Sequence, residues 1–325
     1  MVTFWFGLVV LAWVLYFVLE GFDFGVGVLG PVLGRDEHER GAAIRTIGPF
    51  WDGNEVWLVA AIGVTFAAFP AWYATLLSGL YLPMVAILLL LALRGVALEF
   101  RGKSPSHWRR AWDAVLAASS GGVVLLWGAV LTVFARGLAL SADGSVAGTG
   151  LRRSLAPLLT WPALLGAVLA LGAAVLLGST FLALRTTGPV RRRARRASVL
   201  SGAALATGLF AAGATSSDRL FLAAGVVALG VVLLARSGRE TTAFTGTAIG
   251  VAAAVAAVLT VNGDVVLPST LNEAWSLTRS SAAATPSALR LLTVVGLIVL
   301  PGVLAYQAYS YWVFRRRVAS ERVPS

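Results

Sequence analysis

Cysteine is absent from the chain, and histidine and methionine occur only twice each. The absence of cysteine excludes disulfide bonds and metal centres held by thiolates. His38 and His107 fall in polar stretches between hydrophobic runs, which leaves Met84 as the one methionine or histidine deep inside a run. Because haem iron in a membrane protein needs such ligands at depth, we expect no haem and no metal held by this chain's own residues.

Charged residues are also scarce, at 13% of the 325 residues, whereas 58% are hydrophobic and the mean hydropathy is +0.83. Such a composition indicates a polytopic membrane protein. The net charge of +11 could suggest nucleic acid binding, but the arginines lie between hydrophobic runs, where they orient a membrane protein. The first run has no basic segment before it and no cleavage site after it, so we expect an uncleaved helix and not a signal peptide.

Hydrophobic runs predict an all-α fold with nine transmembrane helices. Each run has about 18–28 residues, which at 1.5 Å per residue is enough to cross a hydrocarbon core of about 30 Å. The predicted spans are residues 4–28, 46–69, 74–98, 112–135, 157–184, 196–215, 217–235, 243–262 and 288–314. The boundary between the sixth and seventh spans is the least distinct, because only a short polar turn at 215–219 separates them.

The basic residues predict the orientation of these spans. Of the 26 Lys and Arg, 20 fall on the side that holds the C-terminus and 6 on the side that holds the N-terminus. Because positive residues concentrate in cytoplasmic loops, we expect the N-terminus outside and the C-terminus in the cytoplasm. The arginine run at 191–196 is expected to face anionic lipid. The Gly-, Ser- and Ala-rich loops at 137–156 and 263–287 are expected to be poorly ordered without a partner.

Carboxylates inside the predicted spans are confined to the first third of the chain. Glu20 and Asp23 end the first span, and Asp52 and Glu55 open the second; a spacing of three residues places each pair on one helix face. At 1.5 Å per residue, Asp23 and Asp52 lie about 30 Å and about 25 Å from the outer ends of their spans. Both pairs are therefore expected at a similar depth near the cytoplasm. The spans from residue 157 onward contain no carboxylate except Asp218, at the start of the seventh, and are expected to be scaffold.

An ionised group near the middle of a bilayer costs from about 2.5 to more than 10 kcal/mol, so carboxylates found there are paired, buried or in use. No basic partner is expected for them at this depth. We predict a proton path made of Asp52, Asp23, Glu20, Glu55, Asn54 and Trp51. Two alternatives remain open: a structural role in which the acids hold helices or subunits together, and a proton-coupled secondary transporter.

The glycines at 25, 27 and 30 match the dinucleotide fingerprint G-x-G-x-x-G. That fingerprint requires a strand before it and a helix after it, whereas a transmembrane helix precedes it here. Gly21, Gly25 and Gly27 are better explained as positions where two helices approach closely.

Several ordered motifs carry a family resemblance. They are LEGFDFGVG at 19–27, WDGNEVWL at 51–58, FAAFP at 66–70, RGVALEFR at 94–101 and the pair Trp112-Asp113, with a weaker return at 306–314. Together they resemble subunit II of the cytochrome bd quinol oxidases. Between about 120 and 295 only the hydropathy profile agrees.

The resemblance implies two four-helix bundles and a peripheral ninth helix. We place the first bundle at 1–136, the second at 137–262, and the outer loop, ninth helix and cytoplasmic tail at 263–325.

The resemblance also implies a function. Members of this family are non-haem subunits of a bacterial cell-membrane enzyme that oxidises quinol and reduces O2 to water. They pair with a haem-bearing subunit I, which holds two b-type haems and one d-type haem. The aspartate that matches Asp52 lines a cytoplasmic proton route in the family, whereas many members have glutamine in place of Glu55. A structural quinone and small single-helix subunits are also compatible with the resemblance, and no catalytic residue is expected in this chain.

Overall fold

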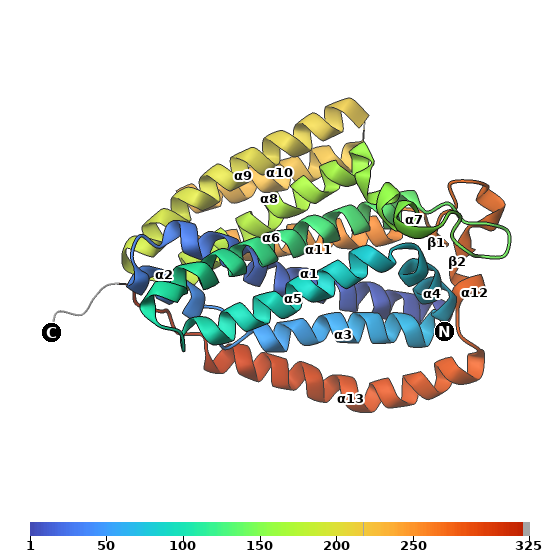
Figure 1. Ribbon diagram of the computed structural model, residues 1–325, viewed down its shortest axis with the longest axis horizontal. Helices are drawn as coiled ribbons and strands as arrows, with labels where there is room; N and C mark the ends of the chain where they lie inside the picture. Colours follow the sequence, from blue (N-terminus) through green and yellow to red (C-terminus); the bar gives the residue numbers. More distant parts are fainter. Residues whose placement is uncertain (217, 321–325) are drawn as a thin grey trace.

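Long helices, arranged side by side, make up most of the computed structural model, which describes residues 1–216 and 218–320 (Figure 1). Ser217, where the seventh span was expected to begin, and residues 321–325 of the expected tail lie outside the described residues. Within the described part, eight helices are long and apolar enough to cross a membrane, or nine if one bent pair counts as a single span. The prediction of an all-α polytopic membrane fold is therefore confirmed.

Each predicted span has a counterpart among the long helices. These are α1 (Val2–Leu33), α3 (Trp51–Ala68), α5 (Tyr81–Arg101), α6 (Ser106–Arg136), α8 (Trp161–Arg185), α9 (Gly188–Ser216), α10 (Arg219–Arg236), α11 (Glu240–Thr260) and α13 (Pro286–Val313). The third span begins later than predicted because Pro70 starts a separate helix, α4 (Pro70–Gly79), bent by 119° from α3. A proline is tolerated at the first position of a helix, where its missing N–H is not needed.

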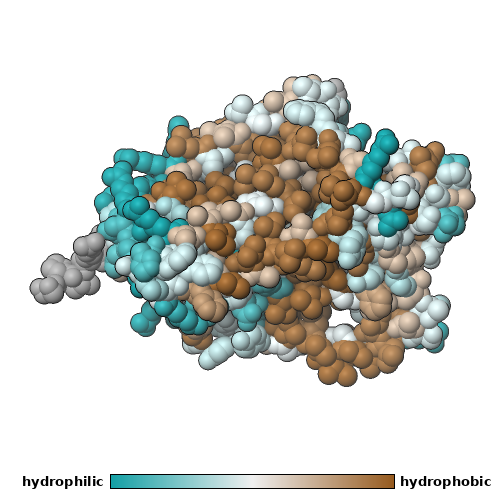
Figure 2. All heavy atoms as spheres, viewed as in Figure 1, coloured by the Kyte–Doolittle hydropathy of each residue, from teal (hydrophilic) through white to brown (hydrophobic). Residues whose placement is uncertain are grey.

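Short elements lie at the two ends of the long helices. They are α2 (Glu37–Arg45), α7 (Gly150–Leu155), η1 (Ala156–Leu159), β1 (Val265–Leu267), η2 (Glu273–Trp275), β2 (Leu277–Thr278) and α12 (Arg279–Ala282). Figure 2 shows hydrophobic side chains across the middle of the visible face and hydrophilic ones gathered at the left, where Figure 1 places α2. We call this the α2 end, and the opposite one the α7 end.

Helix α1 is central, since it packs against α3 and α6 on one side and against α8 and α11 on another. Helices α9 and α10 pack against each other beyond α8, whereas α13 lies along α3 (Figure 1). Of the 28 residues of α13, only Leu289 is buried. Nearly the whole surface of this last helix is therefore open to lipid or to another protein.

Glycines bring α1 close to its neighbours. A Cβ atom on Gly25 would lie 1.9 Å from the carbonyl oxygen of Ala174, and one on Gly178 would lie 2.3 Å from the carbonyl carbon of Gly25. A Cβ on Gly27 would lie 2.2 Å from Oγ of Ser120 on α6. At Gly25 the close atoms are backbone and cannot make room, and at Gly27 the Ser120 side chain would have to move, so the interpretation of Gly25 and Gly27 as close-approach positions is confirmed. A Cβ on Gly21 would lie 3.1 Å from a methyl group of Leu177.

The two Gly- and Ser-rich loops at the α7 end contact each other. Leu138 forms a parallel bridge with Ser269, and Leu140 an antiparallel bridge with Val146. Leu138, Leu140 and Leu267 are all buried, in a cluster that is continuous with the main core. The expectation that these loops need a partner to become ordered is wrong, because their few leucines are enough to join them to each other and to the bundle.

Candidate functional site

Three ionisable side chains meet inside the bundle. Nη1 of Arg94, on α5, lies 2.9 Å from Oε2 of Glu20, and its Nη2 lies 4.0 Å from Oδ2 of Asp23. All three side chains have no exposed surface. The guanidinium carbon of Arg94 also lies 4.8 Å from the centre of the Phe24 ring, a cation–π contact. We call Glu20, Asp23 and Arg94 the ionic cluster.

The ionic cluster overturns the expectation that the acids have no basic partner at their depth. Arg94 lies within the predicted third span, 74–98, but its side chain was not expected to face the acids. It precedes the end of α5 at Arg101 by seven residues, which is about 10 Å along a helix axis. Arg94 lies on the buried side of α5, where it faces the acids of α1.

Asn54 connects the ionic cluster to two further helices. Its Nδ2 donates a 2.7 Å hydrogen bond to Oδ2 of Asp23 and a weak one of 3.5 Å to the carbonyl oxygen of Leu19. Its Oδ1 accepts hydrogen bonds from Nε2 of Gln307 at 3.1 Å and from the hydroxyl of Tyr311 at 2.8 Å. Asn54 is fully buried. One amide on α3 thereby links α1 to α13.

The ionic cluster has unused hydrogen-bonding capacity. The contact between Arg94 and Glu20 is an ion pair without hydrogen-bond geometry. Within the described chain, both carboxylate oxygens of Glu20, Oδ1 of Asp23 and all three guanidinium nitrogens of Arg94 lack a hydrogen-bond partner. Buried polar groups left without partners destabilise a protein. Stability alone is therefore a poor explanation for the cluster, and ionisable groups at such a position mark functional sites.

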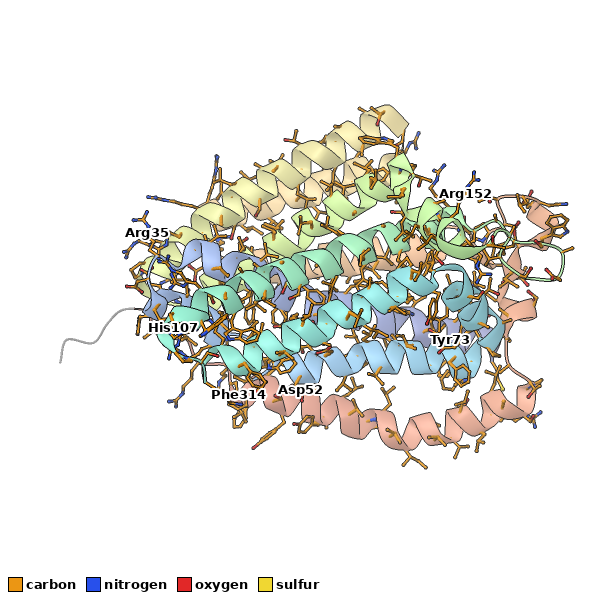
Figure 3. The ribbon with its side chains drawn as sticks, viewed as in Figure 1. Arg35, Asp52, Tyr73, His107, Arg152 and Phe314 are labelled. Atoms are coloured by element: carbon orange, nitrogen blue, oxygen red, sulfur yellow. The ribbon has the colours of Figure 1, made fainter. Side chains whose placement is uncertain are left out.

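The acids of α3 lie at the margin of the cluster. Asp52 is exposed in the first turn of α3 (Figure 3), where a negative charge is favoured by the helix dipole, and its side chain has no ion pair or hydrogen bond with the described residues. Glu55 is half-buried and interacts electrostatically with both Asp52 and Arg94. The Trp51 ring packs on α5 beside Gly95, where a Cβ atom would lie 3.6 Å from it.

The structure thus brings together Glu20, Asp23 and Asn54 among the predicted residues. It adds three that the sequence reasoning missed, namely Arg94, Gln307 and Tyr311. Gln307 and Tyr311 are four residues apart, a spacing that places them on one helix face, and both fall in the motif at 306–314. Of the later spans, which are expected to be scaffold, α13 contributes two side chains that hydrogen-bond to Asn54.

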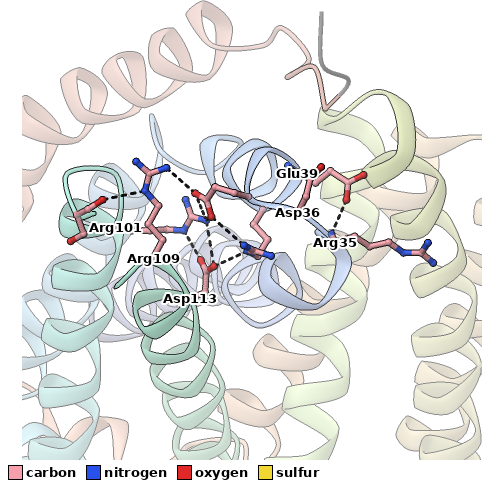
Figure 4. A network of polar contacts seen from close by, with 9 residues as sticks. Arg35, Asp36, Glu39, Arg101, Arg109 and Asp113 are labelled. Atoms are coloured by element: carbon pink, nitrogen blue, oxygen red, sulfur yellow. Dashed lines mark hydrogen bonds and ion pairs between the residues drawn. The ribbon is translucent and has the colours of Figure 1, made fainter. Parts of the chain in front are cut away.

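A second ionic network holds the α2 end together (Figure 4). Oδ1 of Asp113 accepts a 2.5 Å hydrogen bond from Nε of Arg101, and its Oδ2 lies 2.9 Å from Nε of Arg40. Glu37 pairs with Arg40, Arg101 and Arg109 at distances of 3.2 to 3.3 Å. This network fastens α2 to α5 and α6.

The same end of the molecule attaches α2 to α9. Oε2 of Glu39 accepts a hydrogen bond from the backbone N–H of Arg35 at 2.7 Å and pairs with Arg193 at 2.5 Å. Arg191 pairs with Glu240 of α11 at 2.7 Å. The arginine run at 191–196 was expected to face anionic lipid. Two of its members, Arg191 and Arg193, instead form ion pairs within the protein.

Possible metal and haem ligands are dispersed. Among residues 1–216 and 218–320, no group of three or more His, Asp or Glu side chains could hold a metal ion. His38 lies on α2, His107 in the first turn of α6, and Met84 on α5. These positions do not provide a pair of haem ligands at depth.

Comparisons with known proteins agree with this geometry. The family model described as cytochrome bd terminal oxidase subunit II matches residues 1–314. The chain belongs to the cytochrome bd oxidase subunit II family. The resemblance seen in the motifs is thus confirmed, and membership of the subunit II family favours an oxidase subunit over the transporter that the acidic spans left open.

Relatives in the subunit II family differ in how much of the chain they match. Cytochrome bd ubiquinol oxidase subunit 2 of Bacillus subtilis is 36% identical over 97% of this chain and 96% of its own length. Cytochrome bd-I ubiquinol oxidase subunit 2 of Escherichia coli K12 is 36% identical over 55% of this chain and 47% of its own length. The bd oxidase from Geobacillus thermodenitrificans has a chain that covers 96% of this one at a TM-score of 0.67 and 18% identity, which supports the fold.

Proposed function

We propose that this chain is the haem-free subunit of a quinol:oxygen oxidoreductase, in which it stabilises a haem-bearing subunit I and conducts protons from the cytoplasm. The observation that carries the proposal is the buried ionic cluster, which keeps two carboxylates and a guanidinium inside a membrane bundle with hydrogen-bonding capacity to spare. In this proposal the haems, two of b type and one of d type, belong to subunit I, where quinol is oxidised and oxygen reduced.

The proposed route begins at the α2 end. Asp52 is exposed there, Glu55 interacts electrostatically with it, and Glu55 also interacts with Asp23 and Glu20. Protons would pass from Asp52 through Glu55 to the ionic cluster. The Lys and Arg count of 20 against 6 supports a cytoplasmic location for the α2 end, with the N-terminus outside.

Subunit I is the proposed neighbour of α13 and α3. Gln307 and Tyr311 reach Asn54 from α13, whose remaining surface is open. A partner covering α13 would bring its own groups within reach of the cluster. A structural quinone and small single-helix subunits remain compatible with this arrangement.

The proposed route is tested by Asp52→Asn in the assembled complex. The side chain of Asp52 contacts no partner in the described chain, so the nearly isosteric change removes a titratable group without breaking a contact. If proton delivery limits turnover, oxygen consumption per haem falls about tenfold or more, a barrier increase of about 1.4 kcal/mol. Haem content measured on the same sample stays normal.

Glu99→Gln is the matched control, because Glu99 is an exposed carboxylate whose only ion pair in the described chain is with Lys103. It should leave turnover per haem unchanged. Full turnover per haem in Asp52→Asn across the neutral pH range would remove Asp52 from the route. Loss of haem in Asp52→Asn, with normal turnover by the remainder, would assign this residue a structural role instead.

A further inference from the structure

A cavity of about 790 Å³ lies at the α7 end, far from the ionic cluster. The last turn of α6, the first turn of α8, α7 with η1, and parts of the loop at 137–149 surround it. Three arginines line it, namely Arg136, Arg152 and Arg153. The cavity is independent of the proposed proton route, since none of its lining residues belongs to the cluster or to the network at the α2 end.

Positive charge is concentrated in this cavity, although the α7 end as a whole has few basic residues. The α7 end holds only 6 of the 26 Lys and Arg of the chain, and half of them line this one cavity. Arg153 donates a 2.5 Å hydrogen bond to the carbonyl oxygen of Ser78. Arg136 and Arg152 are exposed, and neither guanidinium has an ion pair or hydrogen bond with the described residues. Arg136 is in the last turn of α6 and Arg152 in the last turn of α7, where the helix dipole favours a basic residue, but the dipole does not explain why both line one cavity.

Exposed apolar side chains adjoin the lining residues Arg152, Ala156 and Thr160 in the sequence, and we call these apolar side chains the rim. Leu151 and Leu155 on α7, Leu159 on η1 and Trp161 at the start of α8 belong to the same short segment as Arg152. Leu159 and Trp161 are 69% and 74% exposed. Tryptophan at the end of a membrane helix sits at the level of the lipid headgroups. The segment therefore offers apolar side chains that can contact acyl chains and guanidinium groups that can contact an anionic headgroup.

We propose that this cavity binds an anionic phospholipid, with its phosphate held by Arg136 and Arg152 and its acyl chains lying over Leu159 and Trp161. Guanidinium groups bind phosphate through paired, charge-assisted hydrogen bonds. A free phosphate ion would use the same arginines but has no need of the apolar rim. The rim is the reason for choosing a lipid.

The test uses the whole complex, purified in mild detergent, stripped of lipid and mixed with phosphatidylglycerol or phosphatidylcholine. Bound lipid per complex is counted by native mass spectrometry. We expect phosphatidylglycerol to bind well and phosphatidylcholine poorly. The double variant Arg136→Gln/Arg152→Gln should bind phosphatidylglycerol about tenfold more weakly or worse, because each charge-assisted hydrogen bond is worth at least that factor. Arg136→Lys/Arg152→Lys should restore part of the binding.

The matched control is Arg219→Gln/Arg290→Gln, which removes the same charge at the α7 end from exposed arginines that do not line the cavity. It should bind phosphatidylglycerol like the unchanged complex. Equal binding by the two double variants would overturn the proposal. Trp161→Ala distinguishes a bound lipid from a free phosphate ion, because it should weaken the binding of phosphatidylglycerol. If Trp161→Ala has no effect and millimolar inorganic phosphate displaces the lipid, the site binds a free anion instead. Normal haem content in every variant excludes misassembly as the cause.

Discussion

Arg94 and Glu20 form an ion pair at 2.9 Å in which neither side chain has any exposed surface. The pair joins α5 to α1 in the interior of a membrane bundle. Removing one partner from a buried ion pair leaves an uncompensated charge, whereas removing both is often close to neutral. The relationship between these two residues therefore has a distinct mutational signature.

Arg94→Gln is expected to destabilise the assembled complex by about 3–5 kcal/mol. The double variant Arg94→Gln/Glu20→Gln should recover much of that loss, although Asp23 remains beside position 94. Thermal unfolding of the purified complexes provides the measurement. Lys103→Gln serves as control, since Lys103 follows the end of α5 and forms an exposed pair with Glu99, so its loss should leave the unfolding temperature unchanged. Equal stability of Arg94→Gln and the unchanged complex would contradict the ion pair.

Tyr311→Phe should cost about 0.5–1.5 kcal/mol, the usual value of one hydrogen bond. The variant loses the bond to Asn54 but keeps the stacked contact with Phe50, whose ring centre lies 4.6 Å away. Tyr311→Ala loses both and should also make α13 more accessible to added protease. Tyr309→Phe is the control, because Tyr309 is exposed. A result in which Tyr311→Ala behaves like Tyr309→Phe would mean that α13 is held by other contacts.

Gly25→Ala is expected to force α1 and α8 apart, because the added methyl group would meet the backbone of α8 and not a movable side chain. Overpacking of this kind costs about 1–3 kcal/mol or more. The yield of assembled complex and its unfolding temperature should both fall. Gly230→Ala is the matched control in α10, where nothing lies within 4 Å of the added atom. Normal yield and stability in Gly25→Ala would show that the two helices are less tightly apposed.

Single cysteines test the orientation cleanly because the chain has none of its own. Ala142→Cys lies in the exposed loop at the α7 end, and Arg192→Cys lies in the arginine run at the α2 end. An impermeant thiol reagent added to intact cells should label position 142 but not position 192. Permeabilised cells should give labelling at both positions. The opposite pattern in intact cells would reverse the proposed orientation.

Hydropathy predicted the helices well because the length of an apolar run is a local property. The similar depth expected for Asp23 and the start of the second span followed from the rise per residue alone, and the bond between Asp23 and Asn54 requires it. Arg94 was missed for a different reason. Spacing along a helix gives the height of a side chain, but not which neighbours it faces, and the partners of Arg94 are more than 70 residues away in the sequence.

Tyr311 and the loops at the α7 end show the same limit. The hydroxyl of Tyr311 meets an amide 257 residues earlier, and the bridge between Leu138 and Ser269 joins loops that no short sequence pattern connects. Composition suggested disorder for those loops, whereas three buried leucines order them. Contacts of this kind depend on how helices distant in the sequence pack against one another. The period of hydrophobic residues within one helix does not determine that packing.

The separation of 253 residues between Asn54 and Gln307 also has a consequence for biosynthesis. A ribosome adding 5–20 residues per second needs on the order of 10 to 50 s to make the intervening chain. During that interval α13 has not been completed, so the carbonyl oxygen of the Asn54 side chain lacks both donors from that helix. A newly made chain therefore passes through an intermediate in which α13 does not yet cover Asn54 on α3. Packing of this last helix completes the hydrogen bonds of Asn54.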